Sequence, residues 1–472
     1  MNPRASRFLR RAAARITLLV LALLTVTASD PAHAQRAAVQ GIVIDQSSAH
    51  PLLGATVVLQ QDSQEIRSAV TDRYGLFQVA GLAAGIYRLR IISLGYSTHE
   101  ETIALAPGER LTANRGLSLD PLQLEGMNVS AQDPGAVRRD LGGQTITARD
   151  IARIPTPAAS GDIVGYLQTT PGVVSTGDRG GQLFIRGGEP TQNYVQLDGM
   201  LLYQPFHILG FYSAFPSDIL SRSDIYAGGY GAKFGERISS VIDVWTREGN
   251  KRRFAGAVAA SPFIATLPLE GPIVRDRVSF LASVRESMVE RGAEPLLGEP
   301  LPFAFGDVFA KLHAELNART RLALTGIRTY DRGTLAEPDA GAPAEEVRWT
   351  NEAVGLRYLL LPRILPVSAD LRLSHSRFDS ELGPQGDPSR SSSIWETNLS
   401  LDGTFFSPRI ETEAGLVLRM ISSDTELGGT FQNTEFKGSR IDHLAFYVEP
   451  EWTLGNGLRI RPGALFLVGD AK

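Results

Sequence analysis

The sequence predicts a mainly β protein with three consecutive folded regions. Between residues 36 and 120, short β-rich runs alternate with turns at Gly54, Gly75, Gly85 and Gly95; turn signals every 8–12 residues are typical of a small antiparallel sandwich. Residues 251–472 frequently alternate apolar and polar residues, as antiparallel strands with two different faces do. The region between them mixes helix and strand patterns, which favours an α+β unit.

The first 34 residues are typical of a cleaved secretory signal peptide. Five arginines, from Arg4 to Arg15, precede an apolar run over residues 16–28 and the small-x-small motif Ala32-His33-Ala34. We therefore expect the mature chain to start at Gln35; the alternative is an uncleaved amphipathic anchor. No later apolar run reaches the length of a transmembrane helix.

Composition excludes several classes of function. The chain has no cysteine, which rules out disulfides, thiolate zinc sites and cysteine nucleophiles. Its net charge of −4 becomes more negative once the arginine-rich signal is removed, so a general nucleic-acid-binding role is not expected. The chain contains no HExxH, GxSxG or phosphate-loop motif. No enzyme activity, catalytic residue, metal or cofactor is therefore expected.

The sandwich over residues 36–120 should bury one face of the strand around Tyr87. Arg88 and Arg90 alternate with the apolar residues and should point outward. Asp72 could be a metal ligand, but an Asp-x-x-Gly turn is the favoured interpretation. The expected core contains Leu76, Val79, Tyr87, Leu89 and Ile91.

The pattern of this first region resembles the carboxypeptidase regulatory-like domain, a transthyretin-like β-sandwich. That name describes a fold and implies no peptidase activity. The resemblance rests on Gly41, Asp45, Gly54-Ala55, Thr71-Asp72, Gly75, Phe77, Gly85, Tyr87 and Gly95-Tyr96.

The α+β unit begins with a strand that leads into a short helix over residues 148–154. A second helix should start at a cap from Ser160 or Asp162 and end before Pro171. Strands LFIRGG, YVQLDG and SSVIDVWT follow, separated by glycine-rich turns.

Residues 149–250 resemble the plug domain of TonB-dependent outer-membrane receptors, with the motifs in the family's order. By resemblance, Arg186, Asp198 and Arg237 help to hold the plug sheet or dock it to a barrel wall; exposed charges in turns are the alternative. The plug end AKFGERISSV departs from the pattern of starch-utilisation importers, so a surface lipoprotein lid is not implied. The structural positions implied are Pro171, Gly172, Arg186, Gly187, Gly188, Asp198, Gly199, Gly235 and Arg237.

The family resemblance also implies an energy-transducing protein as partner. It would pair with an extended segment ahead of the plug, the TonB box, by adding a β-strand. In the linker over residues 121–148, the candidate box contains Leu124, Glu125, Met127 and Val129. The alternative is that this segment is only a linker.

Aromatic and polar residues gather in one segment of the plug and could contact a ligand. Packing against the barrel is the favoured alternative. The candidates are Tyr203, Phe206, His207, Phe211 and Tyr212.

Residues 251–472 fit part of an antiparallel transmembrane β-barrel in outer-membrane lipid. Val308, Leu312 and Leu316 share one face of a strand, and Asp307 and Lys311 share the other. We count about ten such strands, whereas plugged transporters have about 22. We therefore expect the sequence to be the N-terminal part of a longer receptor, because open strand edges in lipid are costly.

The sequence thus predicts an energy-coupled outer-membrane receptor that imports a scarce ligand through a plugged barrel. A siderophore, vitamin, peptide or glycan would all suit this function. The alternatives are a non-transporting β-rich surface or adhesion protein and an inactive truncated receptor.

Overall fold

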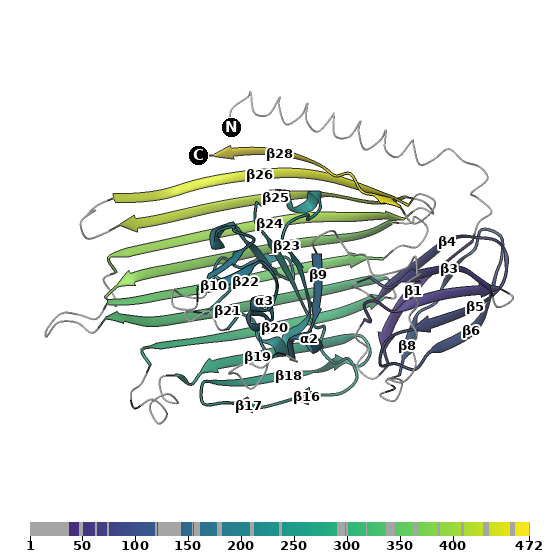
Figure 1. Cartoon of the computed structure of the whole chain (residues 1–472), viewed down its shortest axis with the longest axis horizontal. Helices are drawn as coiled ribbons and strands as arrows, with labels where there is room; N and C mark the ends of the chain where they lie inside the picture. The colour runs from purple at the N-terminus through teal and green to yellow at the C-terminus, as the bar shows by residue number, and fades with distance from the viewer. Residues whose placement is uncertain are drawn as a thin grey trace.

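The computed structural model contains a long antiparallel sheet, a smaller α+β unit in front of it and a β-sandwich at one end (Figure 1). It describes residues 37–46, 51–61, 64–72, 75–118, 120, 143–152, 154, 161–176, 182–207, 212–235, 238–289, 298, 301–317, 319–336, 345–361, 367–384, 388–406, 410–427, 434–453 and 458–471. The predicted signal peptide and TonB box lie outside these residues. In the described part of the chain, none of the helices is long and apolar enough to cross a membrane.

The sandwich has two four-stranded sheets. One contains β4 (Leu76–Leu82), β1 (Ala37–Asp45), β7 (Arg110–Thr112) and β8 (Arg115–Leu117). The other has the order β3 (Gln64–Val70), β2 (Thr56–Gln61), β5 (Gly85–Ile92) and β6 (His99–Leu105).

The core of the sandwich is apolar, as the sequence predicts. Four of the five expected core residues, Val79, Tyr87, Leu89 and Ile91, lie in this core. Leu76 is also buried, but against the end of β22 rather than in the sandwich core. The Asp72 carboxylate accepts the backbone N–H of Leu76 at 2.9 Å, and its carbonyl accepts that of Gly75. Asp72 therefore has the predicted turn role.

The α+β unit, here called the plug region (residues 143–250), has a five-stranded mixed sheet. Its strand order is β13 (Met200–Leu201), β12 (Tyr194–Leu197), β15 (Val241–Thr246), β14 (Leu220–Tyr226) and β9 (Gly143–Thr147). A separate hairpin joins β10 (Val173–Thr176) to β11 (Gln182–Ile185). Short 3₁₀ helices are η2 (Pro190–Gln192), η3 (Ser217–Ile219) and η4 (Ala232–Phe234).

The two predicted helices of the plug region are present. β9 leads into α2 (Ala148–Ala152), and α3 (Ile163–Gln168) follows. Asp162 is the cap of α3, since its side chain accepts the N–H of Val164 at 2.8 Å. Ile163, Val164 and Leu167 point into the core of the plug region.

The long sheet, here called the wall, contains 13 strands among the described residues. Most of its strands pair with the strands that precede and follow them in the sequence. Strands β20 to β26 are each 15 to 20 residues long. The strands are β16 (Ala255–Gly256), β17 (Ala259–Ala260), β18 (Ile264–Val274), β19 (Val278–Ser287), β20 (Phe303–Asn317), β21 (Thr320–Ala336), β22 (Glu345–Leu360), β23 (Val367–Gly383), β24 (Arg390–Phe406), β25 (Ile410–Leu427), β26 (Thr434–Thr453), β27 (Arg459–Ile460) and β28 (Ala464–Ala471).

The estimate of about ten short strands was too low. It missed β18, which contains Pro268 and Pro272. Proline lowers the strand signal because it cannot donate to the ladder. Here β18 pairs along its length with β19, while only the two-residue strands β16 and β17 flank its other side.

The two faces of the wall are inverted relative to a soluble sheet. On β20, Val308 and Leu312 are 53% and 46% exposed, whereas Asp307 and Lys311 are only 2% and 6% exposed. The charged side chains face the plug region and the apolar ones face outward, as the alternation predicts. Such a distribution is typical of a strand with lipid on one side.

The sandwich contacts one end of the wall. Ile42 and Leu76 of the sandwich form an apolar cluster with Leu359 and Leu361 at the end of β22. The Arg252 guanidinium also donates to the backbone carbonyl of Gln46. Figure 1 shows the sandwich beside the strand ends of the wall.

Candidate functional site: the interface between plug and wall

Asp198 links the plug region to two wall strands. It occupies the LDG turn after β12 with a φ of 50°, a left-handed conformation that aspartate tolerates better than most residues. Its carboxylate lies 3.0 Å from the Nζ of Lys311 on β20 and accepts the Thr325 hydroxyl of β21 at 3.3 Å. It also accepts the backbone N–H of Thr246 at 3.0 Å. One turn residue therefore binds both the end of β15 and the wall.

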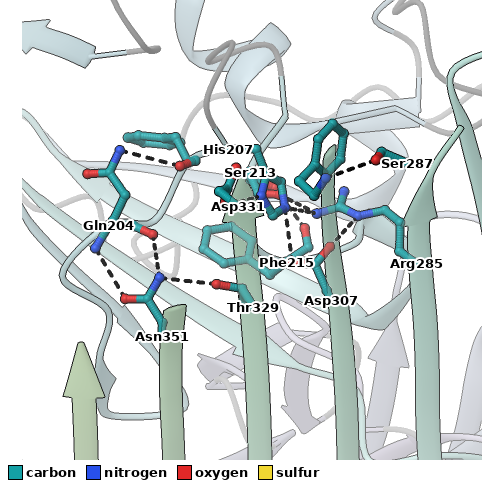
Figure 2. Close-up of polar contacts among 12 residues, drawn as sticks. Gln204, His207, Ser213, Phe215, Arg285, Ser287, Asp307, Thr329, Asp331 and Asn351 are labelled. Atoms are coloured by element: carbon teal, nitrogen blue, oxygen red, sulfur yellow. Dashed lines mark hydrogen bonds and ion pairs between the residues drawn. The ribbon is translucent and has the colours of Figure 1, made fainter. Parts of the chain in front are cut away.

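His207 is the centre of a second buried contact. Its Nδ1 lies 2.9 Å from Asp331 on β21, and its Nε2 lies 3.0 Å from Asp307 on β20. The ring stacks on Phe305 with centroids 4.3 Å apart. Figure 2 shows His207 of the plug region reaching between side chains of neighbouring wall strands.

Arg285 of β19 completes this charged cluster. It forms an ion pair with Asp307, donates to the carbonyl of Ser213, and lies 3.7 Å from Asp162. Asp162 therefore caps α3 and contributes to docking at the same time. In Figure 2, Arg285 and Asp307 extend from adjacent wall strands toward Ser213.

The charge on His207 follows from its surroundings. Burial alone would lower the pKa of the imidazole, but Asp307 and Asp331 raise that pKa to about 9. Both ring nitrogens then carry protons and donate to carboxylates. Burial raises the pKa of the Asp162 carboxyl, although Arg285 opposes this shift.

A neutral contact lies next to the charged cluster. The side chain of Asn351 on β22 accepts the backbone N–H of Gln204 at 3.3 Å and donates to its carbonyl at 2.9 Å. It also donates to the Thr329 hydroxyl at 3.1 Å (Figure 2). This side chain pairs with a plug backbone segment much as a neighbouring strand would.

The other side of the plug region meets the wall through cations. Lys233 of η4 and Arg372 of β23 both pair with Asp402 on β24. Gly199 has a φ of +86°, and a β-carbon there would lie 3.0 Å from Cδ of Arg372. The plug backbone thus approaches the arginine more closely than a larger residue would allow.

A group of possible metal ligands already surrounds an ammonium group. Glu248, His313 and Glu315 bring one ligand atom each within 4.8 Å of one another. Lys251 donates to Glu248 at 2.8 Å and to Glu315 at 2.5 Å. The lysine provides the positive charge at this position.

The remaining predicted plug positions occur mostly in turns. Arg186 is exposed with a φ of 50°, so its geometry fits the alternative of a charge in a turn. Pro171 and Gly172 form the turn after α3, and the Gly172 carbonyl accepts the Arg186 N–H at 2.7 Å. Arg237 lies outside the described residues.

Three glycines differ in what surrounds them. A β-carbon at Gly188 would lie 2.1 Å from the Ser239 hydroxyl, and one at Gly235 would lie 2.8 Å from Leu465 of β28. Gly187 has a φ of +80° and open space around it. Close approach thus explains Gly188 and Gly235, and backbone conformation explains Gly187.

The ligand-contact candidates lie against the wall. Phe206, His207 and Tyr212 are buried. The Tyr203 hydroxyl donates to Glu396 at 3.4 Å, and the Tyr212 ring lies 5.5 Å from that of Phe305. These positions support packing rather than ligand contact; Phe211 lies outside the described residues.

Sequence reasoning missed the wall's half of the site. Asp307 and Asp331 are 100 and 124 residues from His207, so no local motif connects them. The available signal was the alternation that places Asp307 and Lys311 on the inner face of β20.

Two family models match the chain. Residues 38–118 match the carboxypeptidase regulatory-like domain, and residues 142–240 match the TonB-dependent receptor plug domain. The resemblances predicted from sequence are confirmed for these two domains. No curated protein matches the chain.

Solved structures with a similar fold include siderophore receptors. The siderophore receptor PirA of Pseudomonas aeruginosa is 16% identical with a TM-score of 0.52, and the match covers 70% of this chain and 57% of that one. PirA of Acinetobacter baumannii is 13% identical with a TM-score of 0.53. That match covers 72% of this chain and 58% of the PirA chain. FpvA of P. aeruginosa, bound to an iron–pyoverdine complex, is 12% identical with a TM-score of 0.54. That match covers 71% of this chain and 52% of the FpvA chain.

These matches establish a fold and two domain types. The chain spans between half and three-fifths of the length of these neighbours. The chain shares the fold of these neighbours over the matched part.

Proposed function

We propose that this chain, with its regulatory-like sandwich, plug domain and wall, acts as a TonB-dependent outer-membrane receptor. It would import a scarce ligand by energy-coupled opening of the plug. The observation that carries this proposal is the inverted wall, whose apolar side chains face outward while Asp307, Lys311 and Arg285 face the plug. A sheet with this distribution suits lipid outside and a polar plug inside.

The contacts between plug and wall explain why opening would need work. Buried charges at this interface are paired, and removing either partner leaves an uncompensated charge in a poorly hydrated place. Displacing the plug separates Asp198 from Lys311 and His207 from its two carboxylates. A partner that supplies energy from outside the outer membrane is therefore required.

We assign that role to a TonB-type protein that adds a β-strand to the segment around Leu124–Val129. Main-chain hydrogen bonds provide the affinity in such pairing. The expected signal peptide would direct export of the chain from the cytoplasm. In the outer membrane, the sandwich would lie on the periplasmic side. A surface protein without transport activity would have no use for a plug held by this many buried charges.

We propose a siderophore as the first ligand class to test. The PirA proteins are siderophore receptors, and FpvA was solved with an iron–pyoverdine complex. A vitamin, a peptide and a glycan are the competing classes. A binding panel with one member of each class distinguishes them.

The decisive experiment separates ligand binding from uptake. Met127→Pro and Val129→Pro, made in the native gene, should abolish uptake of a bound ligand and leave its affinity unchanged, because proline removes main-chain donors. Val137→Pro, outside the candidate box, is the matched control and should retain uptake. Normal uptake by both box variants would show that this segment is not the coupling strand, and absence of any ligand uptake by the parent would refute the transporter proposal.

A further inference from the structure

A small cavity lies between the plug and the wall, on the side opposite the His207 cluster. Its volume is about 30 Å³, enough for a small ion or a few water molecules. Gln196 and Lys233 line it from the plug. Arg372, Asn398, Ser400 and Arg419 line it from wall strands β23, β24 and β25.

The lining of this cavity is cationic. Lys233, Arg372 and Arg419 border it, and no carboxylate is among the described residues that line it. The carboxylates that balance these cations lie behind them: Lys233 is 3.0 Å from Asp402, and Arg419 is 3.3 Å from Glu396. The cavity is therefore bordered by positive groups whose acidic partners do not line it.

Two amide side chains at the cavity have unmet hydrogen-bonding groups. Gln196 is only 4% exposed, and its Nε2 has no partner among the described residues. The Oδ1 of Asn398 is likewise buried without a partner in that part of the chain. A buried donor without an acceptor is costly, so the cavity should contain a group that accepts from Gln196. Rotation of the Asn398 amide by half a turn presents a second donor.

From these observations we propose that the closed plug holds a small free anion, a halide or a small oxyanion, in this cavity. The anion would accept from Gln196 on the plug and from the Arg372 or Arg419 guanidinium on the wall, and so would link the two. The cavity is too small for the body of a transported ligand. The inference goes beyond the proposed function and does not depend on which ligand is imported.

The test measures thermal unfolding of the purified full chain in detergent. Sodium bromide or sodium phosphate replaces sodium gluconate at constant ionic strength, since gluconate is too large for the cavity. A saturable rise in the unfolding midpoint is expected. Gln196→Leu should weaken the apparent anion affinity about 10-fold, because it removes a hydrogen bond to a charged group.

Gln144→Leu, the same substitution on β9 of the plug and away from this lining, is the matched control and should titrate like the parent. In crystals soaked in bromide, an anomalous peak is expected between Gln196 and the guanidinium groups. Identical titrations of the parent and Gln196→Leu, or a cavity that holds only water in bromide, would overturn the proposal.

Discussion

The sandwich and the interface between plug and wall are buried by different means. The core of the sandwich is apolar, built from residues such as Val57, Leu59 and Leu89. The apolar core of the plug region extends onto Leu281, Phe309 and Ile327 of the wall, but the interface also contains buried charge pairs such as Asp198 with Lys311.

This difference shows how one chain can combine a non-directional and a directional contact. Apolar burial stabilises without direction, roughly in proportion to the area removed from water. Paired charges contribute little net stability, yet each demands its specific partner, and removing one partner leaves the other uncompensated. The charge pairs therefore define the position of the plug against the wall more specifically than the apolar contacts do.

The largest expected effect comes from breaking a buried pair at the interface. Arg285→Met leaves Asp307 and Asp162 without their shared cation, and the loss should be about 3–5 kcal/mol of docking free energy. Hydrogen exchange should become faster at Ser213 and along the plug sheet, with the sandwich unchanged. The exposed pair of Arg90 with Glu100 in the sandwich supplies the control, because Arg90→Met should change stability by about 0–1 kcal/mol. Equal effects of the two substitutions would contradict the distinction.

A large-to-small substitution in the sandwich core should destabilise the sandwich and leave the plug region unchanged. Leu89 is fully buried, so Leu89→Ala should destabilise the sandwich by about 2–5 kcal/mol. Hydrogen exchange should then accelerate in β2 and β5 and leave the plug protected. Ile86→Ala on the same strand, where the side chain is 64% exposed, is the control. Loss of plug protection in Leu89→Ala would mean that the two regions unfold together.

The interface should weaken at alkaline pH. The pKa of His207 is about 9 in the folded protein and near 6.5 when unfolded, so its contribution is complete below pH 6.5 and is lost as pH rises through 9. The loss should be on the order of 3 kcal/mol. Hydrogen exchange of the plug between pH 6.5 and 9.5, corrected for the intrinsic rate, measures it. His207→Gln should abolish this dependence; an unchanged dependence would assign it to another group.

The smallest expected effect comes from two glycines of similar conformation. Gly199→Ala and Gly187→Ala should each cost about 1–2 kcal/mol, because both glycines are left-handed. Gly199→Ala should cost more, because its new methyl group also displaces Arg372. Thermal unfolding of both variants gives the difference. If Gly187→Ala were the more damaging, close approach at Gly199 would not be important.

The sequence predicted what local patterns encode. Period-2 alternation placed Asp307 and Val308 on opposite faces, and a polar residue ahead of an apolar run limited the helix cap to Ser160 or Asp162. It could not predict that His207 lies between Asp307 and Asp331, because packing between segments 100 and 124 residues apart determines that contact. Nor did it reveal β18, where two prolines weakened the strand pattern.

The position of β9 has a mechanical consequence. It is the edge strand of the plug sheet, held through five residue pairs to β14 alone, and it is the first described strand after the sandwich. Tension applied to the chain ahead of Gly143 therefore acts on β9 before any other strand of the plug. The sandwich is anchored at the end of β22, so that tension would stretch the chain between two fixed points. Under load, the plug sheet should unzip from this edge, and the buried ion pairs should separate only afterwards.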